Sequence, residues 1–166
     1  MEWKSGTVTY FSITSQRKIG DCPPFPEMIS MNWPVLCFPT NGDPAVAVSS
    51  MQSLRSATAR GFKSGWYANL KIIDAEGNCC IVTEATIEKP RRKVWLFLGS
   101  LVDCRISLRL DYLTRPDKVG LDEFKKMVCA DLDKHREYYE SAASIREWKS
   151  MVINCHSHRE VIECLS

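Results

Sequence analysis

The densest gathering of side chains that could bind a metal lies near the end of the sequence, where Cys155-His156-Ser157-His158 is followed by Cys164. Thiolates and imidazoles are ligands that zinc prefers. However, the sequence has no C-x-x-C pair, and the two histidines flank a serine that is placed to cap a helix. We therefore expect helix capping here and no metal or cofactor, with zinc binding by this segment as the alternative.

The third histidine, His135, falls on the apolar stripe of a predicted helix, where a packed and hydrogen-bonded imidazole is the ordinary outcome. A general base needs a partner within hydrogen-bonding reach, and the neighbouring residues provide none. The sequence also has no nucleophile elbow, phosphate-binding loop or dinucleotide-binding motif. We therefore expect a protein that binds rather than catalyses, and we keep a thiol- or zinc-dependent enzyme as an alternative.

Acidic residues of the same predicted helix are candidates for contact with a protein partner. Asp133, Glu137 and Glu140 share its outer face, near Asp131. An acidic surface of this kind steers the approach of a basic partner. Because basic residues are interleaved with these four, a solvated helix face is the alternative.

Arg105 and Arg109 project from one face of a predicted strand and form a second candidate contact surface. Basic side chains beside exposed aromatic rings are typical of RNA-binding sheets. Trp66 and Tyr67 could supply such rings, and Arg91-Arg92-Lys93 adds charge, but the rings fit a packed core equally well. The net charge of +2 is also small for a nucleic-acid binder. We therefore expect a protein partner, with an RNA-binding sheet face as the alternative.

A run of strands in the middle of the chain must position the arginines. Between residues 103 and 112 apolar and polar residues alternate, which predicts a half-buried antiparallel strand. Residues 67–73 and 79–87 read as a hairpin with its turn at 74–78, where Gly77 suits a positive φ. With a strand at 94–98, apolar on both sides, these segments predict a four-stranded meander.

The first third of the chain is rich in proline, with six of the eight prolines at about 20–44. Proline fixes φ and removes a backbone donor, so this region is predicted to be a long loop with a short strand at 35–38. Further strands are expected at 7–13 and 45–48. A serine cap, helical spacing and a closing Gly61 predict a short helix at about 51–59.

The last third is predicted to be helical. One apolar stripe with spacings of three and four residues runs through Leu121, Phe124, Val128, Leu132, His135 and Tyr139. Two S-x-x-E capping boxes, at Ser144 and Ser157, predict helices near 145–153 and 158–165. The fold class is therefore α+β, with an antiparallel β-meander sheet packed against a long helix and two short C-terminal helices.

Composition places the chain among globular domains. The 166 residues, 45% hydrophobic and 25% charged, suit one domain covering 1–166. The strongest apolar run, at 94–98, is far shorter than the ~20 residues of a membrane span. No secretory signal is visible in the first residues, so we expect a cytoplasmic protein whose eight cysteines are reduced.

The order of these elements resembles that of a known group of proteins. A short helix ends in a glycine, a strand ends in Asp74-x-x-Gly77, further strands follow, and Gly120-Leu121-Asp122-Glu123-Phe124 opens a helix. Over residues 49–140 this order is similar to that of small bacterial immunity proteins of contact-dependent inhibition and related toxin–immunity systems. The resemblance implies a cytoplasmic protein that blocks a cognate toxin domain by stoichiometric binding, without catalysis.

Overall fold

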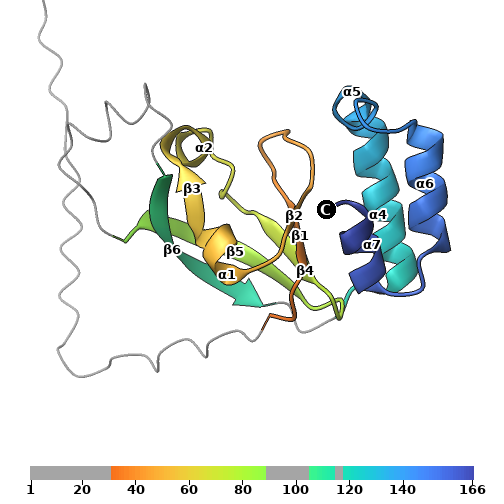
Figure 1. Cartoon of the computed structure of the whole chain (residues 1–166). Helices are drawn as coiled ribbons and strands as arrows, with labels where there is room; N and C mark the ends of the chain where they lie inside the picture. The colour runs from red at the N-terminus through yellow and green to blue at the C-terminus, as the bar shows by residue number, and fades with distance from the viewer. Residues whose placement is uncertain (1–30, 89–104, 115–117) are drawn as a thin grey trace, which may run out of the picture.

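The computed structural model describes residues 31–88, 105–114 and 118–166, so the predicted strands at 7–13 and 94–98 lie outside it. Within these ranges one sheet has the strand order β2-β1-β4-β5-β6-β3, and each adjacent pair is antiparallel (Figure 1). The strands are β1 Val35–Phe38, β2 Val46–Val48, β3 Ser56–Thr58, β4 Lys71–Asp74, β5 Cys79–Ile87 and β6 Arg105–Thr114. The helices are α1 Met51–Arg55, α2 Ala59–Lys63, α4 Leu121–Lys134, α5 Arg136–Tyr139, α6 Ile145–Asn154 and α7 His158–Cys164.

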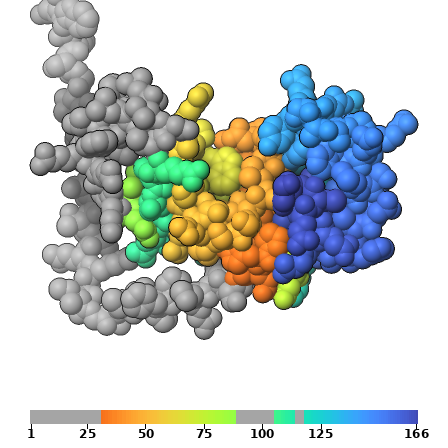
Figure 2. All heavy atoms as spheres, viewed as in Figure 1, coloured from red at the N-terminus to blue at the C-terminus, as the bar shows by residue number. Residues whose placement is uncertain are grey.

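The predicted α+β class, with its antiparallel sheet, long helix and short C-terminal helices, is confirmed. The helices α4, α6 and α7 gather on one side of the sheet, as Figure 1 shows. In Figure 2 they form a continuous blue mass beside the strands. The strands β4, β5 and β6 follow one another in the sheet, and β5 pairs directly with β6.

The adjacent strands β1 and β4 are covered on both faces. Leu36 of β1 and Ile73 of β4 are register partners, and both are fully buried in the core shared with α4, α6 and α7. Their neighbours Cys37 and Ile72 point to the opposite face, because side chains alternate along a strand. There they pack with Leu54 of α1 in a second core.

The segment predicted as one helix at 51–59 is interrupted, which corrects that prediction. Ser50 caps α1 by accepting a hydrogen bond from the Ser53 amide, but the chain then becomes extended and pairs with β6 as β3. Thr58 caps the next helix by accepting from the amide of Gly61. Gly61 therefore lies inside α2 rather than ending the predicted helix.

The strand predicted at 67–73 begins only at Lys71. Tyr67 and Leu70 precede it in a turn and are buried in the second core, where the Tyr67 hydroxyl donates to the Leu54 carbonyl at 2.9 Å. Asn69 in this turn has a φ of 53°, a conformation that asparagine adopts more readily than most residues. Tyr67 is thus buried from within the turn, while Leu70 at its end already accepts a backbone hydrogen bond from Val82 of β5 at 2.9 Å.

The C-terminal helices begin where their caps predict. Ser144 and Glu147 form the complete capping box of α6, with each side chain accepting from the other residue's amide. At α7 only half of the box forms. Ser157 accepts from the Glu160 amide, but the Glu160 carboxylate accepts from the amide of His156 instead of that of Ser157.

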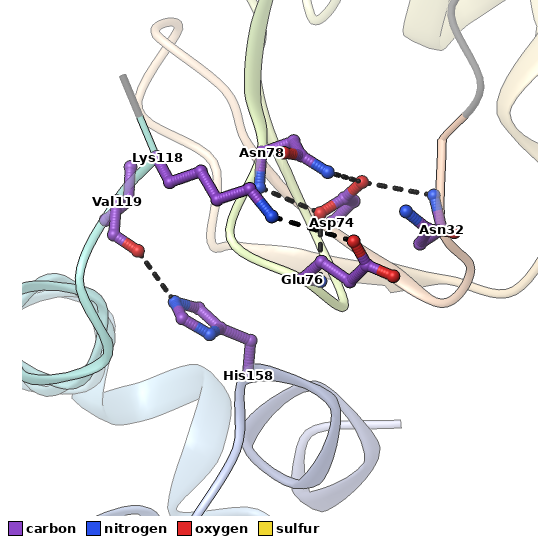
Figure 3. A network of polar contacts seen from close by, with 7 residues as sticks. All are labelled: Asn32, Asp74, Glu76, Asn78, Lys118, Val119 and His158. Atoms are coloured by element: carbon purple, nitrogen blue, oxygen red, sulfur yellow. Dashed lines mark hydrogen bonds and ion pairs between the residues drawn. The ribbon is translucent and has the colours of Figure 1, made fainter. Parts of the chain in front are cut away.

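The turn between β4 and β5 is organised by a buried carboxylate (Figure 3). Asp74 is only 2% exposed and accepts hydrogen bonds from the amides of Asn32, Glu76 and Asn78 and from the Asn78 side chain, at 2.8–3.1 Å. Burial by itself raises the pKa of Asp74, but these hydrogen bonds outweigh it and hold the pKa below its ordinary value. The charged form is therefore the one that fits the fold.

The same turn touches the helical layer at Gly77. Its φ is +83°, and its carbonyl accepts from the Val119 amide at 2.9 Å. A Cβ at this position would lie 2.8 Å from the Val119 carbonyl oxygen and 2.9 Å from Nε2 of His158. That imidazole in turn bonds to the Val119 carbonyl at 2.9 Å (Figure 3). Glycine is required here both by conformation and by contact.

We expect Asp74→Ala to lower the free energy of unfolding by about 3 kcal/mol at neutral pH, because it leaves buried donors without an acceptor. Asp111→Ala is the matched control, since it removes an exposed ion pair with Arg109 and should cost less than about 1 kcal/mol. Urea denaturation measures both.

The pKa of Asp74 is lower in the folded state than in the unfolded state, so its stabilising effect is present at neutral pH and is lost as pH falls through the folded value. The difference between wild type and Asp74→Ala should therefore shrink on acidification. Equal stability of the two proteins at pH 7 would contradict this role of Asp74.

Candidate functional site

A shallow groove runs along the outside of the helical layer, between α6 and the end of α4 with α5. It is lined by Asp133, Arg136, Glu140, Ser144, Ile145, Arg146, Lys149, Ser150, Ile153 and Asn154. Two of the predicted contact residues, Asp133 and Glu140, are therefore brought together here. Their neighbours across the groove come from α6, which the sequence did not single out for contact.

The groove is mixed in charge rather than acidic. Asp133 pairs with Lys149 at 2.7 Å, and Glu140 lies 3.9 Å from Arg136. Such exposed pairs contribute little to stability, but they neutralise the carboxylates that were expected to steer a basic partner. In the part of the chain that the structure describes, no ion pair to Arg146 is found, so this groove presents a cation without a counter-ion.

Asp131 lies apart from this groove and serves the interior. Its side chain is 13% exposed, and Oδ2 accepts from the Ala45 amide and from the Tyr139 hydroxyl, each at 2.9 Å. Burial, followed by the charge of Asp131, raises the pKa of Tyr139 well above its ordinary range, so the hydroxyl remains a donor. Asp131 thus anchors α4 and α5 to the start of β2, and we leave it out of the contact surface.

The stripe predicted to continue one helix through Tyr139 is interrupted, because α4 ends at Lys134. Glu137 therefore lies on α5, where it is exposed but does not line the groove. His135 sits at the break between α4 and α5, with φ −111° and ψ 36°. Its ring is packed, as predicted, but Nε2 has no hydrogen-bond partner among the residues described and lies 3.7 Å from Oδ1 of Asp131. The ring does not line the helix groove, and both the imidazole and the Asp131 carboxylate are largely buried, at 12% and 13% exposure.

The two arginines of β6 lie elsewhere on the molecule. Arg109 is exposed and 3.6 Å from Asp111, and it alternates with buried Leu108 and therefore points away from the second core. Tyr67 is buried in that core, and Trp66 is partly buried against it, in edge contact with Tyr67. Strand β6 does not bring Arg109 and these rings to one surface, and residues 91–93 lie outside the described ranges.

Arg105 borders a separate hollow at the edge of the sheet, whose other lining residues are Met51, Gln52, Ser53, Arg55, Ser56, Glu88 and Ser107. The predicted candidates are therefore dispersed: Asp133 and Glu140 line the helix groove, Asp131 is an interior anchor, Glu137 is exposed elsewhere on α5, and Arg105 and Arg109 lie on β6. The six residues do not form a single contact surface.

The two histidines near the C-terminus do not converge with the neighbouring cysteines on one site. His158 is bonded to Val119 and stacked on Phe124 at 5.1 Å between ring centroids, while His156 is exposed. Cys155 is buried, with its thiol 3.2 Å from the Met151 carbonyl. Within the described ranges no three acidic, histidine or cysteine side chains are arranged to hold a metal ion.

No family model, curated protein or solved structure matches this chain. Among the helices of the described ranges, none combines the length and the apolar character needed to cross a membrane. What the chain does must therefore be argued from its surfaces.

Asp131 and Asp133 lie on the same helix, so substituting each in turn distinguishes a carboxylate that stabilises the fold from one that only lies on the surface. We expect Asp131→Ala to lower the free energy of unfolding by about 2 kcal/mol, because the Ala45 amide loses its acceptor. Asp133→Ala removes only an exposed ion pair and should cost less than about 1 kcal/mol. Chemical denaturation measures both losses of stability. A larger loss for Asp133→Ala than for Asp131→Ala would contradict the assignment of Asp131 to the interior.

Proposed function

We propose that this chain is a non-catalytic protein-binding protein, an immunity protein that neutralises a toxin in the bacterial cytoplasm, and that it binds through α5 and α6. One observation carries the choice of surface. In the described part of the chain five large apolar side chains are exposed, and two of the three most exposed lie on these two short helices. They are Tyr138 at 59% and Ile153 at 61% exposure, whereas Met151, at 39%, faces another side of α6.

The surroundings of Ile153 suit a protein contact. It lies in the helix groove with Arg146 and Lys149, and the groove also holds the carboxylates of Asp133 and Glu140. Apolar and aromatic side chains at the centre, with arginine and paired charges around them, are the usual composition of protein interfaces. An apolar side chain left in water in such a groove gains free energy when a partner covers it.

The rigidity of this surface also favours binding. The capping box fixes the start of α6, and Trp148 of the same helix donates from Nε1 to the Tyr139 carbonyl at 3.2 Å, which ties α6 to α5. A contact surface that is ordered before binding loses less conformational entropy when the complex forms. A preordered surface therefore favours tight stoichiometric binding of a toxin.

The partner proposed is a cognate toxin domain, whose gene we expect beside the gene for this chain. We expect the two purified proteins to elute as one complex in gel filtration at micromolar concentration, and expression of this chain to rescue cells that produce the toxin. Failure to form a complex at that concentration would overturn the immunity role.

The binding surface is tested by a pair of substitutions with equal exposure. Ile153→Glu should weaken the complex by about thirtyfold, the effect of losing a central interface side chain. Leu113→Glu is the control, because Leu113 is 60% exposed but lies on β6. Titration calorimetry should show unchanged affinity for the control. A loss of affinity with Leu113→Glu alone would move the interface to the sheet.

A further inference from the structure

A second hollow lies on the other side of α6, away from Ile153. It is lined by Met151, Asn154, Cys155, Glu160, Glu163 and Cys164. Two thiols therefore open onto one small depression, at the junction of the last two helices. Nothing in the proposed binding surface uses them.

The chain reversal between α6 and α7 brings these thiols together. Cys155 caps the C-terminus of α6, and Cys164 is the last residue of α7. Because the second helix turns back beside the first, the side chains of the two cysteines come close enough for a hydrogen bond. Both also pack against the core of the helical layer, which limits how far they can move apart.

The other described cysteines are placed differently. Cys37, Cys79 and Cys80 belong to the central strands and are buried in the two cores. Cys129 is partly exposed on α4 but does not line the hollow. The pair at the end of the chain is thus the one in which a buried thiol, 7% exposed, sits beside a more accessible thiol.

We propose that Cys155 and Cys164 form a reversible disulfide by exchange with a small-molecule disulfide of the glutathione type. The Cys164 thiolate attacks one sulfur of the small disulfide, forms a mixed disulfide and releases one small thiol. The Cys155 thiolate then attacks the Cys164 sulfur and releases the second small thiol. The two protons lost by the protein thiols end on the two small thiols, and the small disulfide is the oxidant.

The order of the two steps follows from accessibility and charge. Cys164 is the more exposed thiol and meets the oxidant first. Burial, followed by the neighbouring Cys164 sulfur, raises the pKa of Cys155 to about 11, so its thiolate is scarce at neutral pH. Cys155 is therefore the thiol that completes the disulfide in the second step. In a reducing compartment the pair remains as two thiols.

The cross-link would fasten the end of α7 to the end of α6. It closes a loop of roughly ten residues, which by the chain-entropy relation should raise the melting temperature of the oxidised protein by about 5–10 °C. A reductant should reverse the change. The cross-link would therefore change the stability of the helical layer without altering the groove that holds Ile153.

The test uses the purified full chain, equilibrated with oxidised glutathione and then alkylated and mapped by mass spectrometry. We expect one intramolecular disulfide joining the peptides of Cys155 and Cys164, and its loss on addition of dithiothreitol. Cys155→Ser should stop the reaction at a glutathione adduct on Cys164. Cys129→Ser is the matched control and should leave the cross-link and the rise in melting temperature unchanged.

Two results would overturn the proposal. One is a pair of separate glutathione adducts on Cys155 and Cys164 in the wild-type chain, and the other is a cross-link from either residue to a different cysteine. Neither result touches the toxin-binding proposal, because that is measured on the reduced protein with a different surface.

Discussion

The buried carboxylate of Asp74 is the interaction on which the arrangement of the two cores depends. It ends β4, shapes the turn into β5 and holds the amide of Asn32 at the start of the described chain. Three residues later, Gly77 bonds to Val119, directly before α4, and touches His158 at the start of α7. One turn thus fixes where the helical layer meets the sheet, because a buried charge must satisfy its hydrogen bonds and has one way to do so here.

A second anchor sets the far end of the helical layer. The Asp131 carboxylate accepts a hydrogen bond from the Ala45 amide, and the Tyr139 hydroxyl donates to the Ala45 carbonyl, directly before β2. The helices α4 and α5 are therefore held to the sheet at both ends. With its inner face fixed in this way, the layer presents α5 and α6 outward, and their exposed apolar side chains have no role in the core. The inner face of the helical layer is anchored to the sheet, and its outer face carries exposed apolar side chains surrounded by charged ones. The function that we propose follows from this difference between the two faces.

The sequence was sufficient to predict those helices and strands that are determined by interactions between residues close together in the chain. The serine and glutamate that start α6, the alternation along β6 and the apolar stripe of α4 all predicted structure correctly, because capping and periodicity act over a few residues. Prediction failed where the conformation of a segment depends on residues far away in the sequence. The segment at 56–58 left the helix to pair with residues 105–107, and Asp131 turned inward to an amide 86 residues away in sequence. Ile153 was missed, although its place outside the stripe formed by Ile145 and Val152 was a signal that it faces solvent.

The central claim is that the outer surface of α5 and α6 contacts the partner. Amide hydrogen exchange in the presence and absence of the proposed toxin partner tests this claim most directly. Binding should slow exchange in residues 136–154 and leave residues 105–114 unchanged. Protection confined to β5 and β6, with α5 and α6 exchanging as in the free protein, would contradict the account.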